Sequence, residues 1–262
     1  MDANPILAET VRGNWVENRH RGAFAIVDAK GKIIASAGDI ERPVFPRSAI
    51  KSMQALAIFA REAEGKFHHT DEELALAMGV PTKGYVGREH EVQRAVRAAV
   101  EAVIGEPLSE DRCGTDGSSI PTFAAPLRAF AFGFARMATG QGIAPELASA
   151  SRRLFDAATS HPLLVAGTGH ADTLIMEAFG GRVMQKVGAE GVQCGAIRDK
   201  GWGYALKCDD GNIPASQAML AGLLLRYAEP DEGQRAVLER FREQTIRSVR
   251  GADVGVLRAA LG

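Results

Sequence analysis

The feature that most constrains the fold is a change of hydrophobic period at Arg182. After it, the segments 182–186, 191–197 and 203–208 alternate between side-chain types, and short glycine-rich or charged turns separate them. Segments with a period of two that are joined this tightly are typical of antiparallel strands. We therefore expect an antiparallel meander in the last third of the chain.

Further strands are predicted near the N-terminus, and helices in the middle. A tight-turn signal from Asp28 to Gly31 joins two strand-like segments into a hairpin over 22–37, after an earlier strand at 6–11. Apolar residues recur at helical spacing over 49–60, 88–104, 125–137, 145–158, 215–227 and 234–247, with a shorter helix from 70.

This element order predicts an α/β fold of the α+β type. The N- and C-terminal strands form one antiparallel sheet, and the helical middle forms a second layer with a cleft between the two. We treat residues 1–262 as a single domain, with a helical subdomain of about 48–180 between the sheet segments 5–45 and 182–262.

The composition restricts the partners of this domain. Hydrophobic residues make up 46% of the chain and charged residues 24%, as in ordinary soluble globular proteins. The net charge of −1 gives no electrostatic case for a nucleic acid or a membrane. Cys113, Cys194 and Cys208 are widely spaced, which indicates neither a disulfide framework nor a zinc motif. With no export signal or long apolar run, we expect a cytoplasmic protein with a small-molecule ligand.

A hydroxyl and an amine stand three residues apart where a helix is predicted to begin. Pro46 suits the start of a helix, so Ser48 is expected at or near its N-cap and Lys51 on its first turn. The Lys51 amine can then reach the Ser48 hydroxyl. A serine becomes a strong nucleophile when a base takes its proton, and lysine serves as that base when burial lowers its pKa. The plain alternative is a capping serine followed by an exposed lysine.

Two further segments carry groups that can reach a cleft beside this helix. Residues 113–121 are nearly all small, polar or turn-forming, and their glycines let the backbone approach a ligand, although a plain surface turn fits equally well. Lys186 lies on a predicted strand in a Lys-Val-Gly sequence. Serine β-lactamases and penicillin-binding proteins carry a K-T-G segment in that place, beside an S-x-x-K helix. Such a lysine binds a substrate carboxylate or lowers the pKa of a neighbouring amine.

Six stretches together resemble one known family, the asparaginase II or Rhizobium-type L-asparaginases: 19–22, 42–51, 113–117, 120–123, 165–169 and 186–192. The resemblance implies a serine β-lactamase-like fold, a homodimer, and hydrolysis of the side-chain amide of L-asparagine to L-aspartate and ammonia. It also implies that the R-S-x-x-K motif, the D-G turn and a later lysine form the active site. The expected catalytic residues are then Ser48, Lys51 and Lys186, and the expected substrate-binding residues are Arg47, Asp116 and Gly117.

The sequence departs from the family pattern in one block. After Ala77, family members continue into a segment with a second active-site serine, and later carry a zinc-binding cysteine and lysine; both segments are absent here. The third zinc ligand of the family, a cysteine after the D-G pair, is Ser118. We therefore expect no bound zinc and no other cofactor. Two alternatives stay open: a catalytically impaired remnant that keeps the fold, or a Ser/Lys hydrolase of another amide or ester.

Three other sets of polar residues can each be interpreted either as part of a functional site or as ordinary structural or surface residues. His68 and His69 are neighbours that point apart, which favours a solvated loop over a metal pair. His170 and Asp172 follow a glycine turn and are candidates for a substrate loop. Lys207 is either a second lysine facing the cleft or a solvated strand residue.

Overall fold

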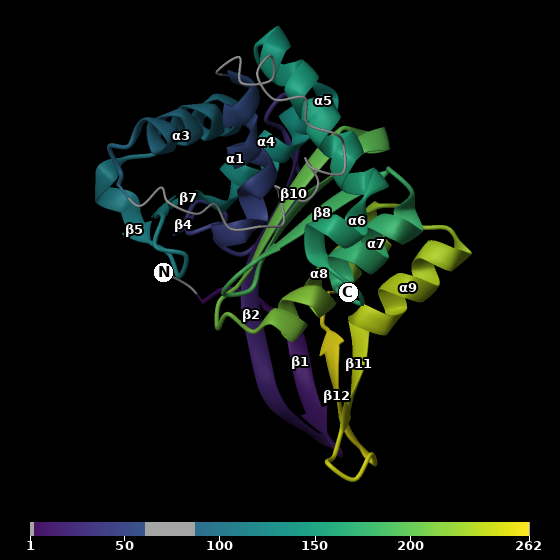
Figure 1. Ribbon diagram of the computed structural model, residues 1–262. Coiled ribbons are helices and arrows are strands. Elements are labelled where there is room, and N and C mark those ends of the chain that lie inside the picture. The colour runs from purple at the N-terminus through teal and green to yellow at the C-terminus, as the bar shows by residue number, and fades with distance from the viewer. Residues whose placement is uncertain (1–2, 61–86, 262) are drawn as a thin grey trace.

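The computed structural model describes residues 3–60 and 87–261. Within those residues, eight strands form one sheet in the order β11-β12-β1-β2-β10-β9-β8, with β3 beside β2 (Figure 1). The predicted meander is confirmed, because β8, β9 and β10 are antiparallel neighbours. The strands are β1 (Ile6–Arg12), β2 (Trp15–Asp28), β3 (Ile33–Ala37), β8 (Val183–Gly188), β9 (Val192–Ile197), β10 (Trp202–Cys208), β11 (Glu243–Arg247) and β12 (Asp253–Ala259).

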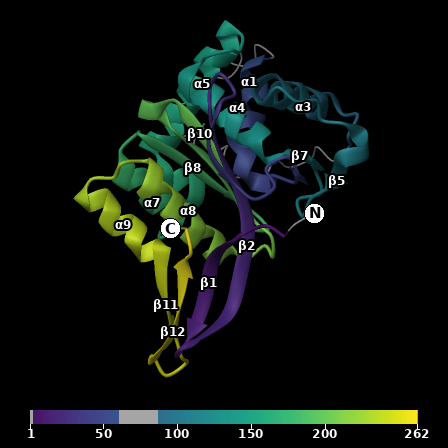
Figure 2. The ribbon, with the colours of Figure 1, turned by 180° about the vertical axis from the view of Figure 1, so that it is seen from behind.

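The long strand β2 belongs to two parts of the sheet. Its first half pairs with β1, and its second half pairs with β10 on one edge and β3 on the other, which confirms the predicted hairpin over 22–37. Figures 1 and 2 show the first half leaving the body of the molecule as an arm with β1, β11 and β12. The second half lies in the body, where β8 to β10 carry the lysine of the candidate site.

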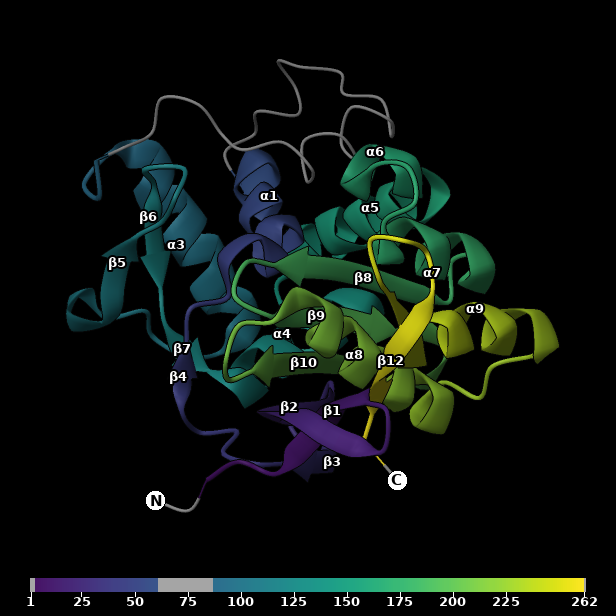
Figure 3. The same cartoon turned by 90° about the horizontal axis from the view of Figure 1, so that it is seen from below.

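Helices cover both faces of the sheet. One core cluster joins one face of β8 to β10 to α1 (Lys51–Ala60), α3 (Glu91–Ile104), α4 (Leu127–Thr139) and α5 (Pro145–Ser160). A second cluster joins the opposite face to α7 (Ala171–Phe179), α8 (Ile213–Tyr227) and α9 (Glu232–Arg242). Figure 3 shows α4 and α8 on opposite sides of β9 and β10. The short helix α6 (Pro162–Ala166) lies between α5 and α7 in sequence.

Several predicted elements differ from the observed ones. The last helix was expected to reach residue 247, but it ends at Arg242, and the next five residues form β11. Pairing of β11 with β12, and of β12 with β1, outweighs the local helical pattern there. The loop at 113–121 contains a hairpin of β5 (Cys113–Thr115) and β6 (Pro121–Phe123). A second two-stranded pair joins β4 (Pro43–Val44) to β7 (Ala125–Pro126), which follows β6 in sequence.

Two expectations lie outside the described residues: the short helix from 70 and the His68 and His69 pair. Among the helices that the structure does describe, none is both long and apolar enough to cross a membrane.

Candidate active site

Ser48 lies in a single tight turn that leads directly into α1. This turn is the 3₁₀ helix η1 (Arg47–Ile50), and Lys51 donates its backbone N–H to the Ser48 carbonyl oxygen. Ser48 lies near the N-cap, as expected, but two residues after the cap residue Pro46, and no side chain caps the turn. Because a 3₁₀ helix has three residues per turn, side chains at i and i+3 lie one above the other. The Ser48 hydroxyl and the Lys51 amine therefore share one side of the turn.

The backbone of this turn is strained and is held against the sheet. Arg47 has a φ of 53°, a left-handed conformation that costs a non-glycine residue about 1–3 kcal/mol. At the end of β8, a Cβ added to Gly188 would lie 2.5 Å from the Pro46 carbonyl oxygen and 3.0 Å from the Ala49 nitrogen. Glycine at 188 therefore lets the end of β8 contact the Ser48 turn directly.

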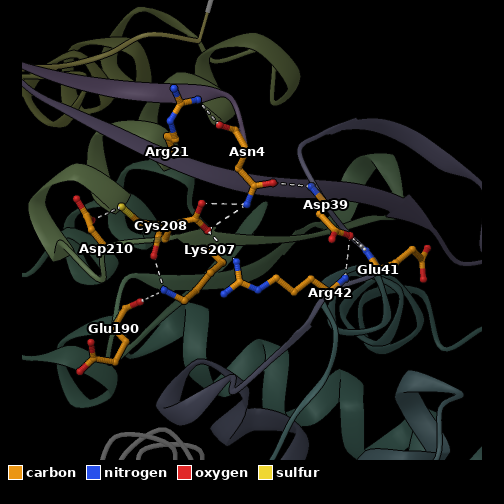
Figure 4. Close-up of polar contacts among 10 residues, drawn as sticks. Asn4, Arg21, Asp39, Glu41, Arg42, Glu190, Lys207, Cys208 and Asp210 are labelled. Atoms are coloured by element: carbon orange, nitrogen blue, oxygen red, sulfur yellow. Dashed lines mark hydrogen bonds and ion pairs between the residues drawn. The ribbon is translucent and has the colours of Figure 1, made fainter. Parts of the chain in front are cut away.

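A polar network anchors the segment that leads to Ser48 (Figure 4). Asn4 Nδ2 donates to both carboxylate oxygens of Asp209 at 3.0 Å, and Asn4 Oδ1 accepts from the Asp39 N–H at 2.7 Å. Asp39 Oδ1 in turn accepts from the Arg42 N–H at 3.0 Å. These bonds join the chain before Ser48 to the turn that follows β10.

Lys186 is a buried cation with a buried partner. Its residue is 8% exposed, and its Nζ lies 3.7 Å from Oδ2 of Asp172, which begins α7. The same Oδ2 accepts from the Val187 N–H at 2.8 Å, and Oδ1 accepts from Gln185 Nε2 at 3.3 Å. A charge this buried is tolerated when it is paired and hydrogen-bonded. Asp172 therefore supplies the partner of Lys186 and holds it in position.

Lys51 is the amine whose pKa the site lowers. Burial lowers the pKa of Lys51 most, the positive charge of Lys186 lowers it further, and the negative charge of Asp116 opposes both. A lysine whose pKa moves toward neutrality holds more of its amine in the unprotonated form. The charges of Lys186 and Asp116 both act on Lys51, although the three residues come from separate elements.

The β5–β6 turn brings the acidic group to the site. Asp116 Oδ1 accepts from the N–H groups of Ser118 at 2.7 Å and Ile120 at 3.3 Å, which fixes the carboxylate. A Cβ on the next residue, Gly117, would lie 3.8 Å from Nη2 of Arg47. Nε of Arg47 is buried and has no hydrogen-bond partner within the described ranges. The turn and the Arg47 guanidinium thus face each other.

The structure places all six predicted site residues in one region, formed by η1, the start of α1, the β5–β6 turn and β8. Lys207, the other candidate lysine, donates to the carbonyl oxygens of Glu190, at 2.7 Å, and of Cys208, and so lies at the β8–β9 turn (Figure 4). The substrate-loop expectation does not fit Asp172, which is 2% exposed, whereas His170 is exposed.

Sequence reasoning missed the partner of Lys186 and the polar groups behind it. Gln185 is fully buried on the opposite face of β8, where it bonds Gln193 at 2.6 Å and accepts from the Tyr204 hydroxyl at 2.8 Å. The sequence did contain one signal: Gln185 and Lys186 are adjacent polar residues in an otherwise apolar strand. Because adjacent strand residues point to opposite faces, each needs a buried polar partner on its own face. No sequence spacing links Gln185 and Lys186 to Asp172, because these residues come together only in the folded structure.

The zinc position of the family pattern does not fit the residues present. Ser118 occupies it with an exposed side chain, and a serine hydroxyl is not among the usual zinc ligands. We derive no step through a metal at this position, and the expected loss of the family zinc stays a prediction.

The antiparallel sheet with helices on both faces, with Ser48 on a helical turn beside the edge strand β8, is a serine β-lactamase-like fold. Solved structures share this fold. A β-lactamase from Mycobacterium bovis superposes with a TM-score of 0.51 at 16% identity, over 79% of this chain and 95% of that one. The native form of Mglu gives 0.52 at 14% identity, over 84% of this chain and 63% of that one, so this chain spans less than two thirds of Mglu.

The chain belongs to the L-asparaginase II family, whose model matches residues 8–79 and 75–259. The two matched segments overlap at residues 75–79. No curated protein matches the chain in sequence.

Proposed function

We propose that this protein hydrolyses the side-chain amide of L-asparagine to L-aspartate and ammonia, with Ser48 as nucleophile and Lys51 as its base. One observation carries the proposal: one turn after Ser48, burial and Lys186 lower the pKa of Lys51. A neutral amine in this place is what an attacking serine hydroxyl needs. Membership of the L-asparaginase II family supports the choice of substrate.

The reaction has two halves. The Lys51 amine takes the Ser48 proton, and Oγ attacks the carbonyl carbon of the substrate amide to form a tetrahedral intermediate. Lys51 then returns the proton to the amide nitrogen, which leaves as ammonia, and an ester of Ser48 remains. In the second half Lys51 takes a proton from water, the hydroxide cleaves the ester, and the proton returns to Ser48 as L-aspartate leaves.

The charges of the site complement those of an amino acid. The Arg47 guanidinium and the Lys186 ammonium bind the α-carboxylate, because both are cations that reach the region of Ser48. Asp116 is held on the β5–β6 turn and binds the α-ammonium, while Gly117 lets the backbone approach the substrate closely. These contacts leave the side-chain amide to face Ser48.

A second candidate function is a catalytically impaired family member that keeps the fold and binds the ligand weakly. The expected loss of a family block after Ala77 favours it, because that block carries a second active-site serine in the family. Residues of one catalytic unit act together, so the loss of a single member can remove most of the rate. As in the sequence-based expectation, we propose a homodimer in the cytoplasm for either function.

Ammonia release from L-asparagine tests the proposal. Ser48→Ala is expected to lower kcat by at least about 10³-fold. Lys51→Arg is expected to do the same while keeping the positive charge, because an arginine cannot serve as a base. Ser52→Ala is the matched control: Ser52 is buried in α1 and its Oγ has no partner in the described part of the chain, so activity is retained.

Two results would reject the proposal in different ways. Unchanged ammonia release by Ser48→Ala contradicts the nucleophile. Folded wild-type protein that binds L-asparagine in calorimetry but releases no ammonia identifies the impaired family member. Turnover of an ester or a β-lactam without ammonia release from asparagine would reassign the substrate.

A further inference from the structure

A second cluster of chemically reactive side chains lies on the opposite face of the sheet from Ser48. His20 comes from β2, Cys208 is the last residue of β10, and Asp210 follows in the turn toward α8. Each offers one ligand atom, and these atoms lie within 4.8 Å of one another. Cys208 belongs to the core cluster under α8, whereas Ala49 of the Ser48 turn belongs to the other cluster.

The three ligand atoms are spaced almost as a bound metal ion would require. His20 Nδ1 lies 2.6 Å from Asp210 Oδ2, and Cys208 Sγ lies 3.0 Å from Asp210 Oδ1 (Figure 4 shows the latter contact). Around a tetrahedral zinc ion, nitrogen, oxygen and sulfur ligands are separated by about 3.3–3.6 Å, as follows from metal–ligand distances of about 2.0–2.3 Å. Lengthening these two separations by less than about 1 Å would bring them to coordination geometry, and the histidine and cysteine ligand atoms already lie within 4.8 Å of each other.

Neighbouring groups orient two of the three ligands. His20 Nε2 lies 3.1 Å from the Thr10 hydroxyl, which fixes the imidazole ring with Nδ1 directed at Asp210. The Asn212 N–H donates to Asp210 Oδ1 at 3.0 Å and holds that carboxylate. Histidines that bind a metal through one ring nitrogen usually make a hydrogen bond through the other. The burial of His20 and Cys208, at 5% and 0% exposure, makes the positions of these ligands rigid as well.

We propose that His20 Nδ1, Cys208 Sγ and an Asp210 carboxylate oxygen bind one divalent ion of the zinc class. A thiolate and an imidazole exclude magnesium and calcium, which take oxygen ligands. On binding, the Cys208 thiol releases its proton to solvent, and His20 Nε2 carries the N–H that it donates to Thr10. Three protein ligands leave one position for water, on the side where Asp210 is exposed.

This site is independent of the proposed hydrolysis and of the zinc position in the family pattern. It joins β2 to the turn after β10, next to Asp209, whose carboxylate holds Asn4. A metal ion there would cross-link β2 to the end of β10, at the place where β2 passes from the arm into the body of the sheet. Its expected effect is therefore on stability.

Cobalt(II) is the probe, because its thiolate complexes absorb light and report both the ligand and the geometry. We would treat the full chain with a chelator, remove the chelator, and titrate with Co²⁺. The expected result is a thiolate-to-cobalt absorption band that saturates at one ion per chain and is lost when Zn²⁺ displaces the cobalt. With Zn²⁺ in about 100-fold excess over its Kd, Tm should rise by about 5 °C or more.

Matched variants identify the ligands. Cys208→Ser should abolish the band and the rise in Tm, and His20→Gln should weaken Co²⁺ binding by at least about 10-fold. Cys113→Ser and His170→Gln, which change a half-buried cysteine and an exposed histidine elsewhere, should leave both signals unchanged. Asp210→Asn alters an exposed residue, so it tests the site even if a core variant fails to fold. Folded wild-type protein without a band, or a band that survives Cys208→Ser or Asp210→Asn unchanged, would overturn the proposal.

Discussion

Replacing Asp172 by asparagine is expected to destabilise the protein far more than the loss of an ordinary ion pair. The substitution keeps the shape of the side chain but removes the charge that lies 3.7 Å from Lys186 Nζ. The two side chains are 2% and 10% exposed, so water cannot replace the lost partner. Breaking a buried pair by removing one partner costs about 3–5 kcal/mol, because the other charge stays buried and unpaired. We expect a loss of about 3 kcal/mol, since asparagine still accepts one hydrogen bond.

The free energy of unfolding in urea measures this loss. The matched control is Asp253→Asn, which removes the partner of Arg247 at 3.1 Å, in a pair whose side chains are 67% and 69% exposed. That variant should cost less than about 1 kcal/mol, as exposed pairs do. A double variant of Asp172→Asn with Lys186→Met should be more stable than Asp172→Asn alone, because no unpaired cation remains. A loss of less than about 1 kcal/mol for Asp172→Asn, or an equal loss for both single variants, would refute the argument.

Further predictions concern the base and the packing of the turn. In pH profiles of kcat, activity should rise as Lys51 loses its proton; Lys186→Met should move this rise to higher pH, because Lys186 lowers the pKa of Lys51, and Asp116→Asn should move it to lower pH. Shifts of the same sign in both variants would contradict the assignment. Gly188→Ala should cost about 1–3 kcal/mol of unfolding free energy and reduce ammonia release, because its Cβ would meet Pro46. Gly233→Ala, inside α9 with its nearest neighbour at 3.5 Å, should instead stabilise by about 0.5–1 kcal/mol.

The sequence was most informative where local pattern and tertiary environment agree. The alternating segments after Arg182 became β8, β9 and β10, since each pairs with its neighbour in sequence. Residues 243–247 were misassigned to a helix, because the strand β12 that pairs with them lies beyond a turn and is itself paired with the N-terminal β1. Pairing with a strand that is distant in sequence cannot be predicted from the pattern of the neighbouring residues alone.

The candidate site shows the same limit. The S-x-x-K spacing placed Ser48 and Lys51 together, because three residues are one turn of a helix. The family motifs supplied Lys186 and Asp116, which the structure brings near Lys51. The strained backbone of Arg47 and the buried partner of Lys186 could not be predicted, because both arise from contacts between β8 and elements distant in sequence.

The pairing of β1 with β12 has a consequence for how the chain acquires its fold. Residues 8–11 lie beside residues 256–259, and β2 pairs with β10 at a separation of about 180 residues. Contacts between such distant segments require large loops to close, which slows folding. During synthesis, the β12-facing edge of β1 stays unpaired until β12 has been made, and the β10-facing edge of β2 until β10 has been made. In that interval the unpaired edges can pair with other chains, which makes aggregation during synthesis a hazard of this topology.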